Sequence, residues 1–229
     1  MEPLSLPEPL KNLLTGIEPK TVTIFYGGPG TGKTNICMLA ALECIKKGGR
    51  VVYMDSEGGF SVERLGQICK AAKMDMDNVL SRIELLQPKS FEEQKSMIKD
   101  IEKKDADLVI VDSAVALYRL EFAENREDSN EPGRQLSKQL SILSRISREK
   151  GISVIATAHT YKNWDTQEDE IVGGEMIKYW SKVMVFLERT GRMSERQARI
   201  VKHFHMEEGK QVKFMLVEEG IAPVRFKIF

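Results

Sequence analysis

The sequence lacks long hydrophobic runs, has little cysteine and carries no net charge. None of its apolar runs approaches the roughly eighteen residues that a membrane-spanning helix needs. The 34 basic and 34 acidic side chains cancel, which excludes a protein that holds nucleic acid by bulk charge and leaves only local patches for such binding. The three cysteines, Cys37, Cys44 and Cys69, lack metal-ligand spacing, and we expect them to be buried free thiols in a reducing compartment.

The N-terminal segment MEPLSLPEPLKNLL contains three prolines and an early glutamate, which is not typical of a signal or transit peptide. We therefore expect a cytoplasmic protein with no membrane partner. The 229 residues are 41% hydrophobic and 30% charged, as in one soluble globular domain. Because no repeat or low-complexity linker interrupts the chain, we predict a single domain over residues 1–229.

Short apolar segments alternate with segments of helical periodicity. We predict strands at residues 21–27, 50–55, 83–87, 107–112 and 152–158. We predict helices at residues 34–46, 62–73, 90–103 and 132–150. Most of these strands are continuously apolar, which is typical of a parallel sheet covered on both faces by helices.

After Gly174 the pattern changes to β-rich segments joined by short turns, at residues 181–189, 198–206, 211–219 and 223–229. This order predicts an antiparallel extension built from hairpins. The fold class is therefore α/β: a mostly parallel sheet with helices on both faces and a C-terminal antiparallel extension. Two long connections, at residues 117–131 and 160–172, stand out because loops of that length are usually functional or mobile.

A phosphate-binding loop is the clearest chemical motif. The pattern Gly27-x-x-x-x-Gly32-Lys33-Thr34 follows a predicted strand and begins a predicted helix. Its glycines let backbone N–H groups point at phosphate oxygens, while Lys33 can reach the β- and γ-phosphates and the Thr34 hydroxyl can bind Mg²⁺. We predict ATP and Mg²⁺ as ligands. The predicted nucleotide-binding residues of this segment are Gly27, Gly28, Pro29, Gly30, Thr31, Gly32, Lys33, Thr34 and Asn35.

Two carboxylates follow neighbouring strands. Asp112 ends the apolar segment LVIVD, where a carboxylate that helps to hold Mg²⁺ is expected, so the predicted metal residues are Thr34 and Asp112. Glu57 follows the second strand within DSEGG, and two glycines beside it leave room near the phosphates. We predict Glu57 as the general base that orients the attacking water. The alternative for Glu57 is a solvated loop residue.

Four motifs together resemble the RecA/RadA recombinase family: the phosphate loop, MDSEGGFSVERL, LVIVDS and VGGEMIKYWSKVMVFLE. The resemblance covers nearly the whole chain, and within the family GPGTGKTN and TAHTYKN are most similar to the short archaeal paralogues of RadA called RadB. It implies a RecA-type P-loop ATPase core, with Glu57 as the catalytic carboxylate and Asp112 at the Mg²⁺ site. It also implies that Arg64 lies near the adenine or ribose, the alternative being an exposed helix residue.

Three features depart from the family pattern, the third being the acidic second long connection. The recombinases carry an Asn-Gln pair after the fifth strand, whose glutamine senses the γ-phosphate, whereas this chain has TAHT with His159 at that position. A neutral imidazole can donate one hydrogen bond to the γ-phosphate, so we assign His159 a catalytic sensor role; the alternative is a polar strand end without a ligand. The chain also begins almost at the core, without the N-terminal helical domain and linker of RadA, which leaves homo-oligomers open and argues against stable filaments.

The two long connections correspond, by the resemblance, to the DNA-binding loops of the family. The candidate DNA contacts in and beside them are Arg119, Arg126, Arg134, Tyr161, Lys162 and Trp164. The second loop is acidic, which makes it a poor surface for phosphates, although its two aromatic residues could stack on bases. Basic residues also gather further along the chain, at Arg189, Arg192, Arg196, Arg199 and Lys202. For each of these sets of residues, the alternative to DNA contact is a solvated side chain or a role in packing.

The resemblance implies an ATP-binding accessory protein of DNA repair and homologous recombination, with weak ATP hydrolysis and modest binding of single-stranded DNA. Its implied partners are the main RadA recombinase or a Holliday-junction nuclease. Two alternatives remain open. One is a DNA-dependent ATPase that catalyses strand exchange, and the other is a KaiC-like signalling ATPase that needs no DNA.

Overall fold

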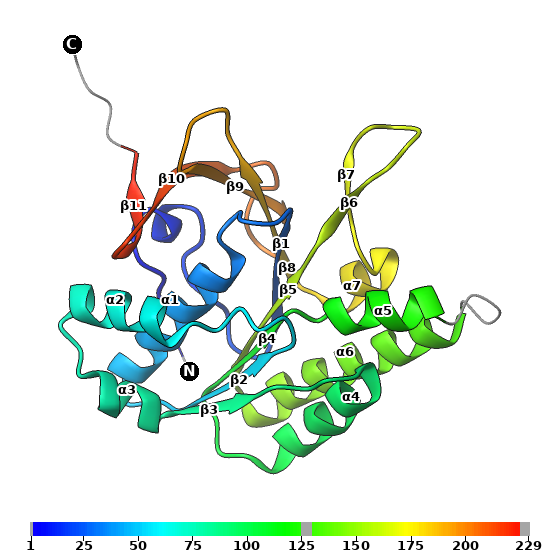
Figure 1. The fold of residues 1–229 in the computed structure, drawn as a ribbon, viewed down its shortest axis with the longest axis horizontal. Coiled ribbons are helices and arrows are strands. Elements are labelled where there is room, and N and C mark those ends of the chain that lie inside the picture. The colour runs from blue at the N-terminus through cyan, green and yellow to red at the C-terminus, as the bar shows by residue number, and fades with distance from the viewer. Residues whose placement is uncertain (1, 125–129, 225–229) are drawn as a thin grey trace.

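The computed structural model describes residues 2–124 and 130–224. Nine strands form one sheet: β1 Val22–Gly27, β2 Val51–Asp55, β3 Ile83–Leu86, β4 Leu108–Asp112, β5 Ser153–Ala158, β8 Val183–Arg189, β9 Glu195–Lys202, β10 Gln211–Val217 and β11 Gly220–Pro223. Their order in the sheet is β11-β10-β9-β8-β1-β5-β4-β2-β3 (Figure 1). The six strands from β8 to β3 are parallel, and β9, β10 and β11 add to β8 in antiparallel fashion. The predicted α/β fold with its antiparallel extension is confirmed, but β8, predicted as the first strand of that extension, instead pairs in parallel with β1.

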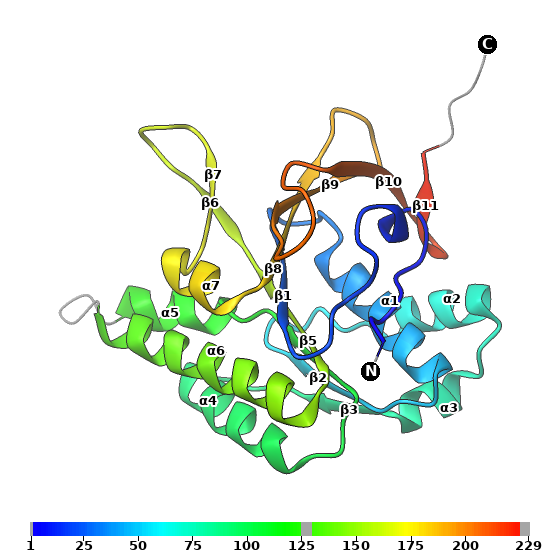
Figure 2. The ribbon, with the colours of Figure 1, turned by 180° about the vertical axis from the view of Figure 1, so that it is seen from behind.

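The helices cover both faces of the sheet. They are η1 Leu10–Asn12, α1 Lys33–Lys46, α2 Val62–Ala72, α3 Met76–Ser81, α4 Phe91–Asp100, η2 Ile101–Lys103, α5 Ala116–Glu124, α6 Asn130–Lys150 and α7 Gly174–Trp180. One core cluster joins the sheet to η1 and α1–α3, and a second joins its other face to α4–α7 (Figures 1 and 2). Successive side chains of β1 point to opposite faces of the sheet, so that Phe25 packs in the first cluster and Ile24 and Tyr26 pack in the second.

The five strands predicted for the parallel sheet agree with the structure to within one residue at each end, and β8 begins two residues later than the predicted 181–189. They were recognisable because β1, β2, β4 and β5 are buried along their whole length and therefore apolar on both faces. Ser90 is the N-cap of α4, since its hydroxyl accepts a hydrogen bond from the Glu93 N–H at 3.1 Å, and the Glu93 carboxylate in turn accepts from the Lys89 N–H at 2.7 Å. The three cysteines are buried free thiols, as expected.

Both long connections were predicted as loops, and both predictions were wrong in part. The first contains α5, which places Leu117 and Tyr118 in the core; residues 125–129 lie outside the described part of the chain. The second is a hairpin of two short strands, β6 Thr160–Lys162 and β7 Asp169–Ile171. Neither has a clear periodicity, because α5 buries only part of its surface and the hairpin strands are mostly exposed.

The C-terminal strands are shifted from their predicted places. β9 spans Glu195–Lys202 instead of residues 198–206, and the last described strand is β11, Gly220–Pro223, before the predicted 223–229. Residues 225–229 lie outside the described residues. The six-residue helix α3 was missed because it is too short to show a helical period. None of the helices in the described part of the chain combines the length and the apolar character of a membrane span.

Candidate functional site

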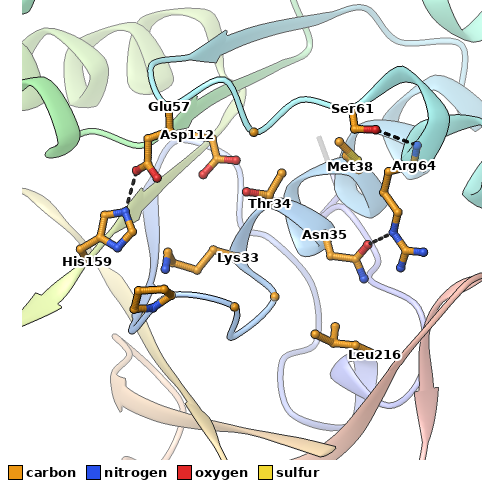
Figure 3. Close-up of a pocket in the computed structure, with 14 residues that line it drawn as sticks. Lys33, Thr34, Asn35, Met38, Glu57, Ser61, Arg64, Asp112, His159 and Leu216 are labelled. Atoms are coloured by element: carbon orange, nitrogen blue, oxygen red, sulfur yellow. Dashed lines mark hydrogen bonds and ion pairs between the residues drawn. The ribbon is translucent and has the colours of Figure 1, made fainter. Parts of the chain in front are cut away.

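The carboxyl ends of β1, β2, β4 and β5 meet at a cavity of about 500 Å³. Figure 3 shows Lys33, Thr34, Glu57, Asp112 and His159 on one side of it. On the other side lie Asn35, Met38, Ser61, Arg64 and Leu216. The remaining residues that line the cavity are Pro29, Gly30, Gly32 and Gly59. The predicted phosphate loop, both predicted carboxylates, His159 and Arg64 therefore share one cavity.

The phosphate loop requires glycine for two different reasons. A Cβ at Gly27 would lie 2.0 Å from the carbonyl oxygen of Leu187 on the neighbouring strand, so no side chain fits there. Gly32, the N-cap of α1, has φ +99°, a left-handed conformation that other residues rarely adopt. The loop is closed by Thr31, whose hydroxyl donates to the Gly28 carbonyl at 2.9 Å. These constraints place the first turn of α1 at the floor of the cavity.

Lys33 is a buried cation at the N-terminus of α1, with 7% of its surface exposed. Its ammonium donates to the carbonyl oxygens of Gly27 and Gly28, at 2.8 and 3.0 Å. Burial lowers its pKa, and the charges of Glu57 and Asp112 oppose that shift. Among the described residues no carboxylate lies within 4.0 Å of the ammonium. A buried ammonium beside a helix N-terminus fits an anionic group such as a phosphate.

Asp112 is held in one orientation by its neighbours. Its Oδ1 accepts from the Thr157 hydroxyl at 2.6 Å and its Oδ2 from the Tyr53 hydroxyl at 2.9 Å. Burial raises the pKa of Asp112, and the hydrogen bonds from Thr157, Thr34 and Tyr53 work against that rise. No group of three or more His, Cys, Asp or Glu side chains in the described ranges could hold a metal ion by itself. The Thr34 and Asp112 oxygens suit Mg²⁺ when phosphate oxygens and water complete its shell.

Glu57 and His159 contact each other directly. The imidazole Nε2 of His159 lies 2.7 Å from Oε1 of Glu57, across the ends of β2 and β5 (Figure 3). The hydrogen bond with His159 is the largest cause that lowers the pKa of Glu57, against a burial that raises it. Glu57 is therefore a carboxylate at neutral pH with one oxygen already engaged.

Asp55 is a site residue that the sequence analysis missed. Its carboxylate, 2% exposed, accepts the backbone N–H groups of Glu57, Gly59 and Phe60 at 3.2, 3.0 and 3.0 Å. These three hydrogen bonds fold the loop that presents Glu57 to the cavity. The signal was present in the sequence, because an aspartate two residues before a Glu-Gly-Gly segment is typical of such a turn.

Replacing Asp55 with alanine should destabilise the protein, because three partly buried N–H groups lose their charged acceptor. We expect the free energy of unfolding to fall by about 1–3 kcal/mol, measured by urea denaturation. The matched control is Asp105→Ala, since the Asp105 side chain is exposed and its ion pair with Arg50 is at the 4.0 Å limit. Equal denaturation midpoints for the two variants would contradict the role assigned to Asp55.

Arg64 connects helix α2 to the turn between β10 and β11. Its guanidinium donates to Oδ1 of Asn35 at 3.0 Å and to the carbonyl oxygens of Val217 and Glu218 at 2.5 and 2.8 Å. Arg64 lines the cavity wall together with Leu216, and its place near a base or ribose stays a prediction. Arg64 is thus more than an exposed helix residue, because it fixes the far wall of the cavity.

The candidate DNA contacts lie apart from this cavity. Arg119 and Arg134 are exposed on α5 and α6, and Arg126 lies outside the described residues. Tyr161 and Lys162 belong to β6, where the Tyr161 hydroxyl donates to Glu170 at 2.6 Å. Trp164 follows β6 in the turn of the hairpin. The five of these residues that the structure describes do not line the cavity of the phosphate loop.

Two arginines contact the phosphate loop from its outer side. Arg189 and Arg196 are directly opposite each other on β8 and β9. The Arg196 Nε donates to the Gly30 carbonyl at 2.8 Å, and a Cβ at Gly30 would lie 2.3 Å from an Arg189 nitrogen. Burial, followed by the charge of Arg189, lowers the pKa of Arg196. Sequence spacing gave no signal for this contact, because it depends on the strand register.

Comparison with known proteins identifies the family of this chain. The Rad51 family model matches residues 8–224. A DNA repair and recombination protein RadB from Methanobrevibacter smithii is 38% identical over 222 residues, covering 93% of this chain and 92% of that protein. Another from Methanosphaera stadtmanae is 39% identical over 213 residues, covering 90% of this chain and 89% of that protein.

A solved structure gives the same result. The crystal structure of the RadB recombinase superposes with a TM-score of 0.82 at 32% identity, covering 95% of this chain and 97% of that chain. These likenesses extend over nearly the full length of both proteins in each pair. The chain belongs to the Rad51 family and, within it, to the RadB proteins.

Proposed function

We propose that this protein binds ATP with Mg²⁺, hydrolyses it slowly, binds DNA modestly and acts as an accessory protein in DNA repair and homologous recombination. The observation that carries the proposal is the buried Lys33 ammonium at the N-terminus of α1, in one cavity with Thr34, Asp112 and Glu57. The printed names of the RadB relatives, DNA repair and recombination proteins, support the biological role.

In this proposal one part of the cavity holds the phosphates and Mg²⁺, and the other part holds the base and ribose. Lys33 and the loop N–H groups hold the phosphates, and Thr34 and Asp112 supply oxygens for Mg²⁺, which would neutralise phosphate charge when bound. Arg64 and Leu216 form the wall for the base and ribose. Glu57 accepts a hydrogen bond from the attacking water and then its proton. We attribute slow hydrolysis to His159, which stands in the sensor position and contacts Glu57 at 2.7 Å.

DNA is best accommodated on the arginine-rich face of β8 and β9. Arg189 and Arg196 lie against the phosphate loop, and no carboxylate in the described ranges pairs with either within 4.0 Å. Neighbouring arginines without acidic partners favour an anionic ligand such as a phosphate backbone. The same contact with Gly30 gives DNA a direct route to the nucleotide site.

The remaining parts of the proposal concern organisation and partners. We propose that residues 1–229 form one ATPase core, since a single sheet joins the phosphate loop to the C-terminal strands. The three buried free thiols support a reducing, cytoplasmic environment. The proposed partners are single-stranded DNA, the main RadA recombinase or a Holliday-junction nuclease, and a second copy of this chain.

The test is Mg²⁺-ATP hydrolysis with and without single-stranded DNA, together with DNA titrations at several salt concentrations. We expect salt-dependent DNA binding and a hydrolysis rate that DNA leaves almost unchanged. If DNA raised the hydrolysis rate by about tenfold or more, which corresponds to an activation free energy lower by about 1.4 kcal/mol, the protein would instead be a strand-exchange motor. Hydrolysis without any DNA binding, in stable hexamers, would favour a KaiC-like signalling ATPase.

Replacing Arg189 with alanine tests the DNA face separately. We expect a weaker affinity for single-stranded DNA of any sequence and a salt slope that is smaller by roughly one phosphate contact. Fluorescence anisotropy at several salt concentrations measures both. Arg148→Ala is the control, because Arg148 is exposed in the last turn of α6, away from the carboxyl ends of the strands. An unchanged salt slope in the Arg189 variant would place DNA elsewhere.

A further inference from the structure

The β6–β7 hairpin stands away from the body of the protein, as both ribbon views show (Figures 1 and 2). Its two strands form a sheet of their own, with Thr160 opposite Ile171 at the base. At its tip Trp164 is 90% exposed, and Tyr161 on β6 is 48% exposed. Large aromatic side chains are enriched where proteins contact partners, and a projecting tryptophan is a common anchor of such contacts.

The turn that carries Trp164 is ordered by its own hydrogen bonds. Oδ1 of Asn163 accepts from the N–H groups of Asp165 and Thr166, at 2.9 and 3.2 Å. The Gln167 amide donates to the Trp164 carbonyl at 2.8 Å, and the Asn163 side chain donates to Glu170 at 2.6 Å. A turn that is already ordered loses less conformational entropy when a partner binds. The backbone that carries Trp164 therefore has a defined conformation.

The charge of the hairpin distinguishes between classes of partner. Residues 160–172 contain four acidic side chains and one lysine, and that lysine, Lys162, lies 3.6 Å from Asp169. A DNA backbone would be repelled by this excess of negative charge, and the one lysine is already paired. A basic protein segment would be attracted to it.

A groove beside the hairpin continues the acidic surface. A cavity of about 790 Å³ is bordered by the hairpin, by α7, by the first residues of β8 and by the last residues of β9. Glu168 and Glu208 are among the residues that line it. Neither has an ion-pair partner within 4.0 Å in the part of the chain that the structure describes. Five carboxylates and two lysines line the groove; Lys178 pairs with Glu175 at 2.7 Å, and Lys202 donates to the neutral Ser181 carbonyl at 2.8 Å. The net charge of the lining residues is therefore negative.

We propose that the β6–β7 hairpin and this groove dock a basic segment of a partner protein. Trp164 contacts an apolar side chain or a guanidinium group of that segment, and Glu168 and Glu208 pair with its lysines or arginines. The hairpin is then an arm for protein contact, while DNA stays on the arginines of β8 and β9. The inference does not depend on ATP hydrolysis, because none of its residues lines the nucleotide cavity.

The test is binding of a short labelled peptide of alternating arginine and leucine, with a glutamate–leucine peptide as control, followed by anisotropy. We expect the intact chain to bind only the basic peptide, and Glu168→Lys or Trp164→Ala to weaken that binding by about tenfold or more. Met193→Ala is the control variant, since Met193 is equally exposed on the β8–β9 turn. Circular dichroism verifies that each variant is folded.

Parallel titrations with single-stranded DNA complete the experiment. The proposal expects Trp164→Ala to leave DNA affinity unchanged and Glu168→Lys to leave it unchanged or raise it. Equal binding of the two peptides by the intact chain, or basic-peptide binding that neither variant weakens, would overturn it. A loss of DNA affinity in Trp164→Ala would also overturn it, and would identify the hairpin as a DNA-binding arm that stacks on bases.

Discussion

Replacing Lys33 with alanine is expected to abolish measurable ATP binding. The Lys33 ammonium is buried at the N-terminus of α1, and its present acceptors are two neutral carbonyl oxygens. Hydrogen bonds to charged groups contribute about 1.5–3 kcal/mol each, so losing contacts to phosphates should weaken binding by about 100-fold or more. Calorimetric titration with Mg²⁺-ATP measures the effect.

The control for this variant lies on the same helix. Lys46→Ala removes a partly exposed lysine in the last turn of α1, whose ion pair is with Glu43 one turn earlier. We expect Lys46→Ala to leave ATP affinity unchanged, because exposed ion pairs of this kind contribute little to the stability of the protein. Full ATP affinity in the Lys33 variant would show that the phosphate-loop assignment is wrong.

The parts of the site that sequence could predict are continuous in the chain. The phosphate loop needs a strand, a glycine-rich turn and a helix in immediate succession, and all three lie between Val22 and Lys46. Asp112 follows a buried strand whose apolar sequence identifies it. Because the carboxyl ends of parallel strands share one edge, Lys33, Glu57 and Asp112 could be expected to meet there.

The parts that sequence could not predict depend on pairing between distant segments. Arg196 reaches Gly30 only because β9 pairs with β8, which in turn pairs with β1. A shift of one residue in either register would turn its side chain to the other face of the sheet. Arg64 likewise contacts the turn between β10 and β11, more than 150 residues away in the chain. Apolar periodicity contains no information about such registers.

The contact between Glu57 and His159 also depends on how distant strands are arranged in the sheet, and Glu57 is the residue of the second prediction. Each residue was predicted for the site from its own motif, but their 2.7 Å contact arises because β2 and β5 flank β4 in the sheet. We expect Glu57→Gln to reduce ATP hydrolysis by about 100-fold or more while ATP affinity changes little, because the amide cannot accept a proton from water. Steady-state hydrolysis and calorimetric titration of the same preparation separate the two quantities.

The matched control for Glu57→Gln is Glu63→Gln. Glu63 is exposed in the first turn of α2, and the variant should retain full hydrolysis.

Replacing His159 with alanine tests the coupling between His159 and Glu57 through the pH dependence of the hydrolysis rate. The hydrogen bond with His159 lowers the pKa of Glu57, so its removal lets that pKa rise and leaves less carboxylate at acidic pH. The acid limb of the rate profile should therefore move to higher pH. An acid limb that stays in place would mean that His159 does not act through Glu57, and hydrolysis retained in Glu57→Gln would assign the general base to another residue.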